Sequence, residues 1–398
     1  MKKLLFTTSI FIFSALVILS GVEVSFSQGL WTQKANLTGA ARTNACGFSI
    51  GAKGYICCGF DGTNYLDDLW EFDPTGNSWT QKANIPLKRE GAVAFTIGTK
   101  AYIGTGQDSV KLRDFWMWNQ TNNTWTQKQN FLSTARSEAA GFSIGAKGYI
   151  GTGNDGTNRY DFYEYDTLTN VWTQKADFTQ PGRNSCIGFS FNGMGYMGSG
   201  YKSGTVYTQI YQYSPSINAW TYIGIVNYSA YSMSACIVGN NVYFGTGIDD
   251  NSITYSKFSK WDPVNDTISL TPFGGTSRYN AVSFSIANNV YIGTGYDTWV
   301  TQDLWEYTIP PTSAPSTDFS SQVFLYPNPV VNNLQIYIDN GQNKNIELKI
   351  FNSSGEKVSY SKNGKMNMEI NLSFLHSGVY YIKISSEEKT TVKRFVKM

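Results

Sequence analysis

The stretch Trp31-Thr32-Gln33-Lys34 recurs along the chain, and this recurrence decides the fold. The same four residues stand at 79–82, 125–128 and 172–175, and Trp220-Thr221 continues the series. A tyrosine marks the same period, with steps of 47 residues and a last step of 48: Tyr55, Tyr102, Tyr149, Tyr196, Tyr243 and Tyr291. Six copies of this length predict an all-β fold, a propeller with one four-stranded blade per copy.

Each copy contains four short runs of alternating apolar residues. In the first complete copy these runs cover 45–50, 55–59, 69–73 and 79–82, and turns rich in Gly and Asn separate them. A period of two within short runs indicates strands rather than helices. The first run carries small residues on one face, as expected of an innermost strand that is crowded around the axis. The later runs carry Trp and Tyr, which fill the wider space between blades.

The two ends of the array predict how the ring closes. The chain enters at Trp31, the marker of a fourth strand, and leaves at 305–308, within a third strand. An N-terminal strand at about 30–36 should therefore complete the last blade. This gives six blades within residues 28–309, and closure leaves no long exposed strand edge.

These marks resemble those of kelch-repeat propellers. That family places an Arg before the first strand, a Tyr beside two glycines after the second, and a Trp in the fourth. The glycine pair departs from the pattern, because these copies read Gly-Thr-Gly, as at 104–106. The resemblance covers 29–309 and implies a six-bladed kelch-type propeller, in which loops at one mouth of the central channel commonly hold ligands.

The first 27 residues have the pattern of a secretory signal peptide. Lys2 and Lys3 precede an apolar run at 4–19, and small residues at 25 and 27 suit a signal peptidase. The pattern predicts cleavage between Ser27 and Gln28. The alternative is an uncleaved N-terminal membrane anchor.

A different domain follows the array. Residues 310–321 read as a Pro/Ser/Thr linker, and the short strands of 322–398 predict a small Ig-like β-sandwich. This segment resembles the C-terminal sorting domain of the Bacteroidetes type IX (Por) secretion system, through 326–329, 352–358, 375–380 and the basic end at 393–397. The sorting-signal residues are Pro327, Asn328, Pro329, Gly378, Tyr380 and Lys397.

The sorting resemblance has consequences for location and partners. It implies export through the periplasm by the type IX secretion machinery, to the medium or to the outer-membrane surface. Contact with a membrane is then expected only during export or through surface attachment.

The composition excludes several function classes. Only 15% of the 398 residues are charged and the net charge is +2, so we expect no nucleic-acid partner. The one histidine, His376, lies in the sorting segment, which leaves the propeller without a histidine for a copper site or a Ser-His pair. We predict no metal and no cofactor. Aspartates after the second strands suit turns better than Ca²⁺ binding: Asp61, Asp155, Asp249, Asp250 and Asp297.

The five cysteines are an odd number, so at least one thiol stays free. They lie in predicted inner strands, where cysteine behaves as a small buried apolar residue. A redox pair at Cys57 and Cys58 is disfavoured, because adjacent cysteines bridge only with strain. A disulfide between Cys46 and Cys57 remains open.

The candidate ligand site is a series of arginines. Five of the chain's eight arginines stand directly before an innermost strand, and the remaining repeat has Ala230 there. They should ring one channel mouth, where planar donors suit carboxylates or sulfates: Arg42, Arg89, Arg136, Arg183 and Arg278. The alternative is a structural role, with bonds to nearby backbone or Asp. Glu90, Glu138, Tyr231 and Tyr279 lie in the same loops.

The sequence therefore predicts a secreted or surface-exposed propeller that binds a protein or a glycan. No catalytic residue stands out, and we expect binding rather than catalysis. Two alternatives stay open. One is a mutarotase- or epimerase-like enzyme that acts on a sugar acid at the arginine-lined mouth, as in the kelch enzymes that interconvert sialic acid anomers. The other is a structural adhesin without a small ligand.

Overall fold

Short alternating runs between tight turns form antiparallel sheets throughout the chain. The computed structural model describes residues 29–178, 181–262, 266–309, 323–338, 346–352, 356–362, 367–385 and 390–398. The chain divides into two units, Met1–Pro310 and Pro311–Met398. The described ranges contain no helical segment with the length and hydropathy of a bilayer span.

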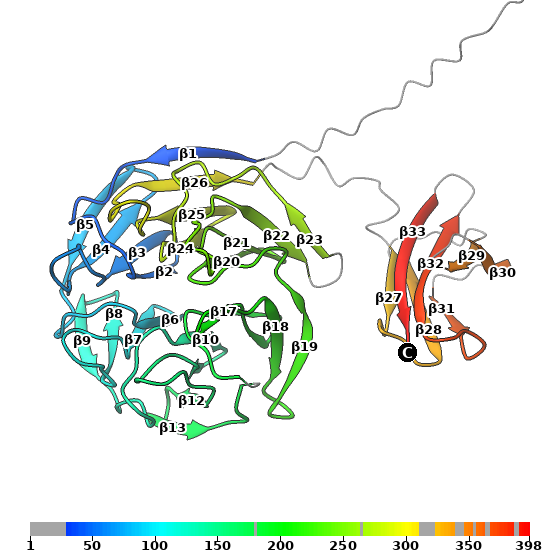
Figure 1. The fold of residues 1–398 in the computed structure, drawn as a ribbon, viewed down its shortest axis with the longest axis horizontal. Coiled ribbons are helices and arrows are strands. Elements are labelled where there is room, and N and C mark those ends of the chain that lie inside the picture. The colour runs from blue at the N-terminus through cyan, green and yellow to red at the C-terminus, as the bar shows by residue number, and fades with distance from the viewer. Residues whose placement is uncertain are drawn as a thin grey trace, which may run out of the picture. The chain divides into compact units, whose positions relative to one another are not determined.

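Within the first unit, the described residues form six four-stranded sheets around one axis (Figure 1). Blade one contains β2 (Cys46–Ile50), β3 (Lys53–Cys57), β4 (Leu69–Asp73) and β5 (Ser78–Lys82), paired in that order. The next four blades follow the same order: β6 (Val93–Ile97), β7 (Lys100–Gly104), β8 (Phe115–Asn119), β9 (Thr124–Gln127); β10 (Ala140–Ile144), β11 (Lys147–Gly151), β12 (Phe162–Asp166), β13 (Val171–Gln174); β14 (Ile187–Phe191), β15 (Met194–Gly198), β18 (Gln209–Ser214), β19 (Ala219–Ile225); β20 (Ser234–Val238), β21 (Asn241–Gly245), β22 (Phe258–Asp262), β23 (Asp266–Ser269). A small hairpin, β16 (Tyr201–Lys202) with β17 (Thr205–Val206), extends blade four.

The sixth blade joins the two ends of the array. It contains β24 (Val282–Ile286), β25 (Asn289–Gly293), β26 (Leu304–Thr308) and, outermost, β1 (Leu30–Lys34). Trp31 pairs with Tyr307, and Figure 1 shows β1 along the outer edge beside β26. The predicted closure by the N-terminal strand is therefore confirmed.

Neighbouring blades pack through aromatic rings and glycines. Phe48 stacks on Tyr55 within blade one, with ring centroids 5.1 Å apart. Gly54 faces Phe284 of blade six so closely that a Cβ there would lie 2.1 Å from the ring. Gly54, the residue before the marker tyrosine of blade one, thus leaves the space that the Phe284 ring occupies.

The second unit is a sandwich of two sheets, as predicted. One sheet contains β27 (Val323–Tyr326), β28 (Asn333–Ile338) and β31 (Asn367–Asn371); the other contains β30 (Lys357–Lys362), β29 (Glu347–Asn352), β32 (Gly378–Ser385) and β33 (Thr390–Lys397). Buried residues of both sheets, among them Leu334 and Ile382, share one apolar core. The predicted signal segment with its Ser27–Gln28 cleavage site, and the predicted linker, lie outside the described residues.

Candidate functional site

The five arginines take part in a repeated bonding pattern inside the blades. Each guanidinium donates through Nη1 to the backbone carbonyl sixteen residues later, at 2.9–3.3 Å. Four of them also form a two-point ion pair with the aspartate that begins the third strand region: Arg42–Asp68, Arg89–Asp114, Arg136–Asp161 and Arg278–Asp303.

This bonding corrects the predicted anion-binding ring. All five arginine residues are at most 1% exposed. Four of them donate to carbonyls and to a carboxylate within their own blades, and Arg183 donates to the carbonyls of Pro181 and Ser199. A guanidinium that is buried and paired is not free for a ligand, so the role of Arg42, Arg89, Arg136, Arg183 and Arg278 in this structure is structural. The sequence contains the signal: where an arginine occurs, an aspartate usually follows 25 or 26 positions later.

Blade five shows how the pattern is replaced. Ala230 stands at the arginine position, and Lys257 stands at the aspartate position. The Tyr228 hydroxyl donates to the Thr246 carbonyl at 3.1 Å, the bond that an arginine makes elsewhere. The Lys257 ammonium lies 4.9 Å from the ring centroids of Tyr228 and Tyr255. A cation over aromatic rings has thus taken the place of the ion pair.

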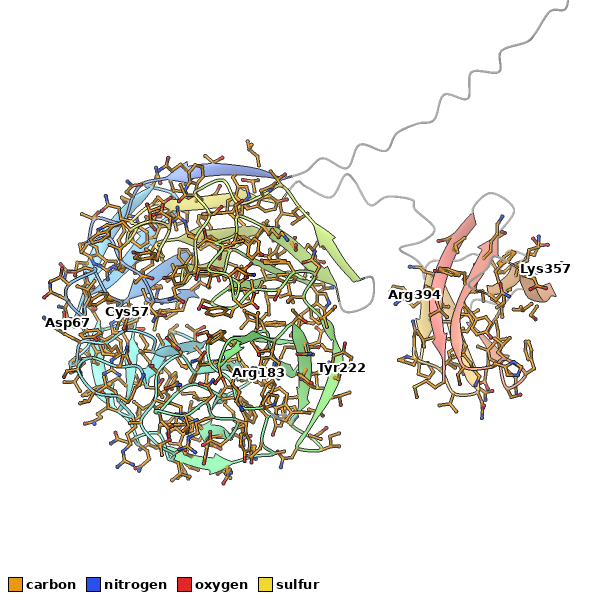
Figure 2. All side chains as sticks on the ribbon, viewed as in Figure 1. Cys57, Asp67, Arg183, Tyr222, Lys357 and Arg394 are labelled. Carbon is orange, nitrogen blue, oxygen red and sulfur yellow. The ribbon has the colours of Figure 1, made fainter. Side chains whose placement is uncertain are left out.

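Blade four is intermediate between the two arrangements. It retains Arg183, but Gln209 replaces the aspartate. The guanidinium lies over the ring of Tyr207, 4.2 Å from its centroid, and over Phe178. Figure 2 shows Arg183 on the inner side of this blade.

A closed ring of backbone hydrogen bonds surrounds the mouth of the channel, the end at which the inner strands begin. One residue per blade donates its N–H to the carbonyl of its counterpart in the preceding blade, at 2.8–3.2 Å. All six have φ between 53° and 58°. We call them the mouth ring: Asn44, Gly91, Glu138, Ser185, Ser232 and Asn280. The backbone is therefore the same in every blade, and only the side chains differ around the mouth.

The channel itself is narrow. A cavity of about 130 Å³ lies at the mouth ring, and one of about 200 Å³ follows beside the inner strands. Small residues such as Ala45, Ala92 and Ala139 line both. Sites for drug-sized ligands usually measure about 300–1,000 Å³, so a larger ligand would lie over the mouth and insert only one group.

The residue before each member of the mouth ring pairs with the loop after its blade's second strand. This pairing occurs in all six blades, but the residue types of the pair differ from blade to blade. On one side they are rich in tyrosine. Tyr201 of blade four stacks on Tyr231 of blade five, with centroids 4.7 Å apart. Tyr279 pairs with Tyr296 in blade six, with centroids 5.6 Å apart. All four are partly exposed, and we call them the aromatic arc.

The opposite side of the mouth is a polar arc of linked side chains. Gln107 donates to Glu90 at 2.8 Å and accepts from Lys111 at 2.6 Å. Lys111 also donates to the Ser137 hydroxyl at 2.6 Å. Asn158 continues the network, since its side-chain carbonyl accepts from the amides of Asn154 at 2.7 Å and Asn184 at 3.3 Å.

Glu138 is the one ionisable side chain of the mouth ring. Its carboxylate accepts from the Ser185 hydroxyl at 3.4 Å. Burial raises the pKa of Glu138, and the charge of Glu90 adds to the effect, while Lys111 and Ser185 oppose it. Burial also raises the pKa of Tyr231, with contributions from nearby tyrosines and from Glu138. The mouth therefore combines a carboxyl that holds its proton more tightly than usual with aromatic faces.

The aspartates after the second strands form turns. Asp61 accepts from the backbone N–H groups of Thr63 and Asn64 at 2.8 and 2.6 Å. The same kind of turn recurs at Asp155, Asp249 and Asp297, and Asp250 lies in one of them. No group of three or more acidic, cysteine or histidine side chains among the described residues is arranged to hold a metal ion.

In the sandwich, residues predicted to form the sorting signal lie at or beside the last strand, β33. Asn328, which stands between Pro327 and Pro329 in the sequence, accepts from the Val396 N–H at 2.9 Å. Gly378 pairs with Lys397 in the ladder, and the Tyr380 ring lies 5.7 Å from Phe395. Lys397 is 7% exposed. His376 belongs to this unit, where its carbonyl accepts from the Tyr380 hydroxyl.

Comparison with known proteins agrees with both units. Residues 324–398 match the secretion system C-terminal sorting domain, and residues 41–86 match the kelch motif. A solved structure titled "Structure of YjhT" is similar over 70% of this chain and 97% of its own, with a TM-score of 0.60 and 14% sequence identity. At that identity the similarity shows the fold alone. No curated protein matches the chain.

Proposed function

We propose that this chain, a kelch propeller with a type IX C-terminal sorting domain that implies secretion, binds an uncharged glycan at its channel mouth. One observation carries the proposal. The backbone hydrogen bonds of the mouth ring repeat from blade to blade, whereas the side chains around the mouth differ. Residues that serve the fold should repeat with the fold, so the differences at the mouth are best explained by a ligand.

The chemistry of the two arcs indicates the ligand class. Tyrosine faces pack against the C–H faces of a sugar ring, and their hydroxyls reach its oxygens. The polar arc offers amide, hydroxyl and carboxylate groups that donate to and accept from sugar hydroxyls. The five arginines of the repeated pattern are engaged inside the blades, and the Lys111 ammonium is already bonded to Gln107 and Ser137. Glu90 and Glu138 disfavour an anion. A neutral, hydroxyl-rich ligand fits these groups best.

The proposal is tested by presenting the exported protein to a panel of neutral, acidic and amine-bearing glycans. We expect saturable binding of neutral glycans. Replacing Tyr231 by Ala should weaken it by about 30-fold, equivalent to about 2 kcal/mol, as for an aromatic at the centre of an interface. Tyr222, which is 56% exposed on the outer strand β19, supplies the control, since Tyr222→Ala should leave affinity unchanged (Figure 2).

A second candidate is acid–base chemistry on the bound sugar. Glu138 favours it, because its raised pKa and its place at the mouth suit proton transfer to or from a hydroxyl. The alternative predicted from the sequence, an enzyme that acts on a sugar acid, is less favoured, because the arginines that would bind the acid are buried in the blades. If a neutral reducing sugar is turned over, Glu138→Gln should abolish turnover while binding persists. An adhesin without a small ligand would bind nothing on the panel.

A further inference from the structure

Blade one differs from the others by three cysteines that lie together. Cys46, Cys57 and Cys58 are each at most 4% exposed and belong to one apolar cluster. The positions of Cys57 and Cys58 are held in the other five blades by Gly followed by Thr or Ser, as in Gly104-Thr105. In a chain of near-identical repeats, two neighbouring departures in one blade call for a common explanation.

The thiols of Cys57 and Cys58 are in contact. Their Sγ atoms lie 3.3 Å apart. Successive side chains of an extended strand point to opposite faces, so this contact requires the backbone to leave the extended form. Cys58 does so, with a φ of 65°. The fold thus brings together two side chains that a regular strand would separate.

Cys46 is a poorer partner for either thiol. It lies opposite Cys57 in the β2–β3 ladder. The two-residue turn between Ile50 and Lys53 begins the ladder with a hydrogen-bonded pair, and alternation makes Cys46 and Cys57 another such pair, at about 5.5 Å between Cα atoms, a separation that a disulfide can span. The Cys46 thiol, however, is directed away from this pair, at the Ala92 carbonyl of blade two, 3.3 Å away.

Both thiols are free in this structure, and the sequence alone disfavours their pairing because of strain. From their contact we nevertheless infer that Cys57 and Cys58 form a disulfide while the chain passes through the periplasm. A disulfide-bearing thiol oxidase is the required oxidant. By exchange, its S–S bond is reduced to two thiols, while the cysteines lose two protons and two electrons and gain one S–S bond. An exported chain passes through such an oxidising compartment.

The burial of both residues sets the order of events. Burial raises the pKa of the Cys57 thiol, so the folded protein offers no reactive thiolate there. The bond must therefore form before blade one closes. Adjacent Cα atoms lie about 3.8 Å apart, below the usual span of a disulfide, and the bond is strained. The same burial then shields it from reductants. It clamps the turn whose Cys58 carbonyl accepts from Arg42 at 2.9 Å.

Tryptic mapping of the exported full-length protein tests this inference. The protein is alkylated in denaturant without reductant and then digested. Cleavage after Arg42, Lys53 and Lys82 separates Cys46, in peptide 43–53, from the adjacent pair, in peptide 54–82. We expect peptide 54–82 to be unalkylated and about 2 Da lighter than its reduced form, for two lost hydrogens. Peptide 43–53 should carry one alkyl group.

Two results would overturn the inference: two alkyl groups on peptide 54–82, or a cross-link between the two peptides. Variants sharpen the assignment without depending on the stability of the blade, because the readout is taken in denaturant. Cys46→Ser should leave the bond intact. Cys57→Ser should leave Cys58 fully alkylated.

Discussion

Arg42 and Asp68 form a two-point ion pair inside blade one, with Nη–Oδ distances of 2.5 and 2.8 Å. The pair joins the chain before the innermost strand to the start of the third strand, and the arginine is 0% exposed. Its position removes the guanidinium from the mouth of the channel. What remains at the mouth is a set of tyrosines, amides, hydroxyls and carboxylates with one ammonium, Lys111, that is bonded to Gln107 and Ser137, and the proposed ligand follows from that set.

The ion pairs should matter for stability rather than for binding. Replacing Arg89 by Ala leaves the partly buried Asp114 carboxylate without its ion-pair partner, and we expect a loss of up to about 3 kcal/mol in the free energy of unfolding, the lower end for a buried pair. Denaturant unfolding measures this. The double variant with Asp114→Ala should be less destabilised than the single one. Unchanged stability with lost glycan binding would restore the ligand-binding role.

An arginine at position 230 should destabilise blade five. Ala230 is fully buried, Tyr228 occupies the bond that the guanidinium would make, and Lys257 would face the new charge. We expect Ala230→Arg to lower the melting temperature. Adding Lys257→Asp should recover part of the loss, since it recreates the pair of the other blades. Equal melting temperatures for the single and double variants would count against the exchange described for this blade.

Acid should unfold the propeller through its paired carboxyls. Burial opposes ionisation of Asp161, but the bonds from Arg136 outweigh it and lower its pKa; Asp68 behaves likewise with Arg42. A folded pKa below the unfolded value of about 3.9 means that this stabilisation is complete above the unfolded value and is lost as pH falls through the folded one. The melting temperature should therefore fall steeply below about pH 4.

The contribution of Glu138 to stability should change with pH in the opposite direction. Its raised pKa means that the folded protein holds this proton more tightly, which favours folding at low pH and is lost as the pH rises through the folded pKa. Glu138→Gln should therefore raise the melting temperature at pH 7 and change it little at pH 3. A variant that is less stable than the native protein at pH 7 would contradict this.

Ring closure should depend on Trp31. This side chain is 8% exposed and contacts Phe258, Phe273 and Tyr307. Trp31→Ala should cost about 3–5 kcal/mol in the free energy of unfolding. Trp299, 64% exposed, is the matched control, and Trp299→Ala should stay within about 0.5 kcal/mol. Similar losses for the two variants would disprove closure by the first strand.

The sorting domain should be required for export and dispensable for folding. A chain that ends at Ser316 should accumulate in the periplasm of its host with the melting temperature of the intact propeller, since the propeller has its own cores. Fractionation and thermal denaturation measure both. Normal release of the truncated chain would exclude handling by the type IX machinery.

The repeat was enough to predict the blades and the closure by Trp31, and the short alternating runs of 322–398 predicted the sandwich. These follow from hydrophobic alternation and from a tyrosine whose spacing survives in all six copies. The position of the arginines before the innermost strands was predicted correctly. The direction of their side chains, into the blades rather than toward the channel mouth, was not. Burial of a side chain depends on which partner the tertiary fold brings to it, and the partner Asp68 is 26 residues away from Arg42, directly before β4.

The mouth could be predicted only in part. Glu138 and Tyr231 were recognised as neighbours of the arginine series, but Tyr201 and Tyr296 were not. The latter two follow second strands, and only the pairing of those loops with the residues before the inner strands places them at the mouth. A pairing of Cys57 and Cys58 was considered and disfavoured from the sequence, because the contact of their thiols rests on the φ of one residue.

The most direct test of the account is the affinity of the exported protein for two glycans that differ in a single group, a neutral oligosaccharide and its uronate counterpart with a carboxylate at C6. We predict saturable binding of the neutral glycan, weaker binding of the uronate, and loss of neutral binding in Tyr231→Ala. Tighter binding of the uronate than of the neutral glycan would contradict the account. If replacing Arg89 also weakened that binding, the arginines would form the ligand site.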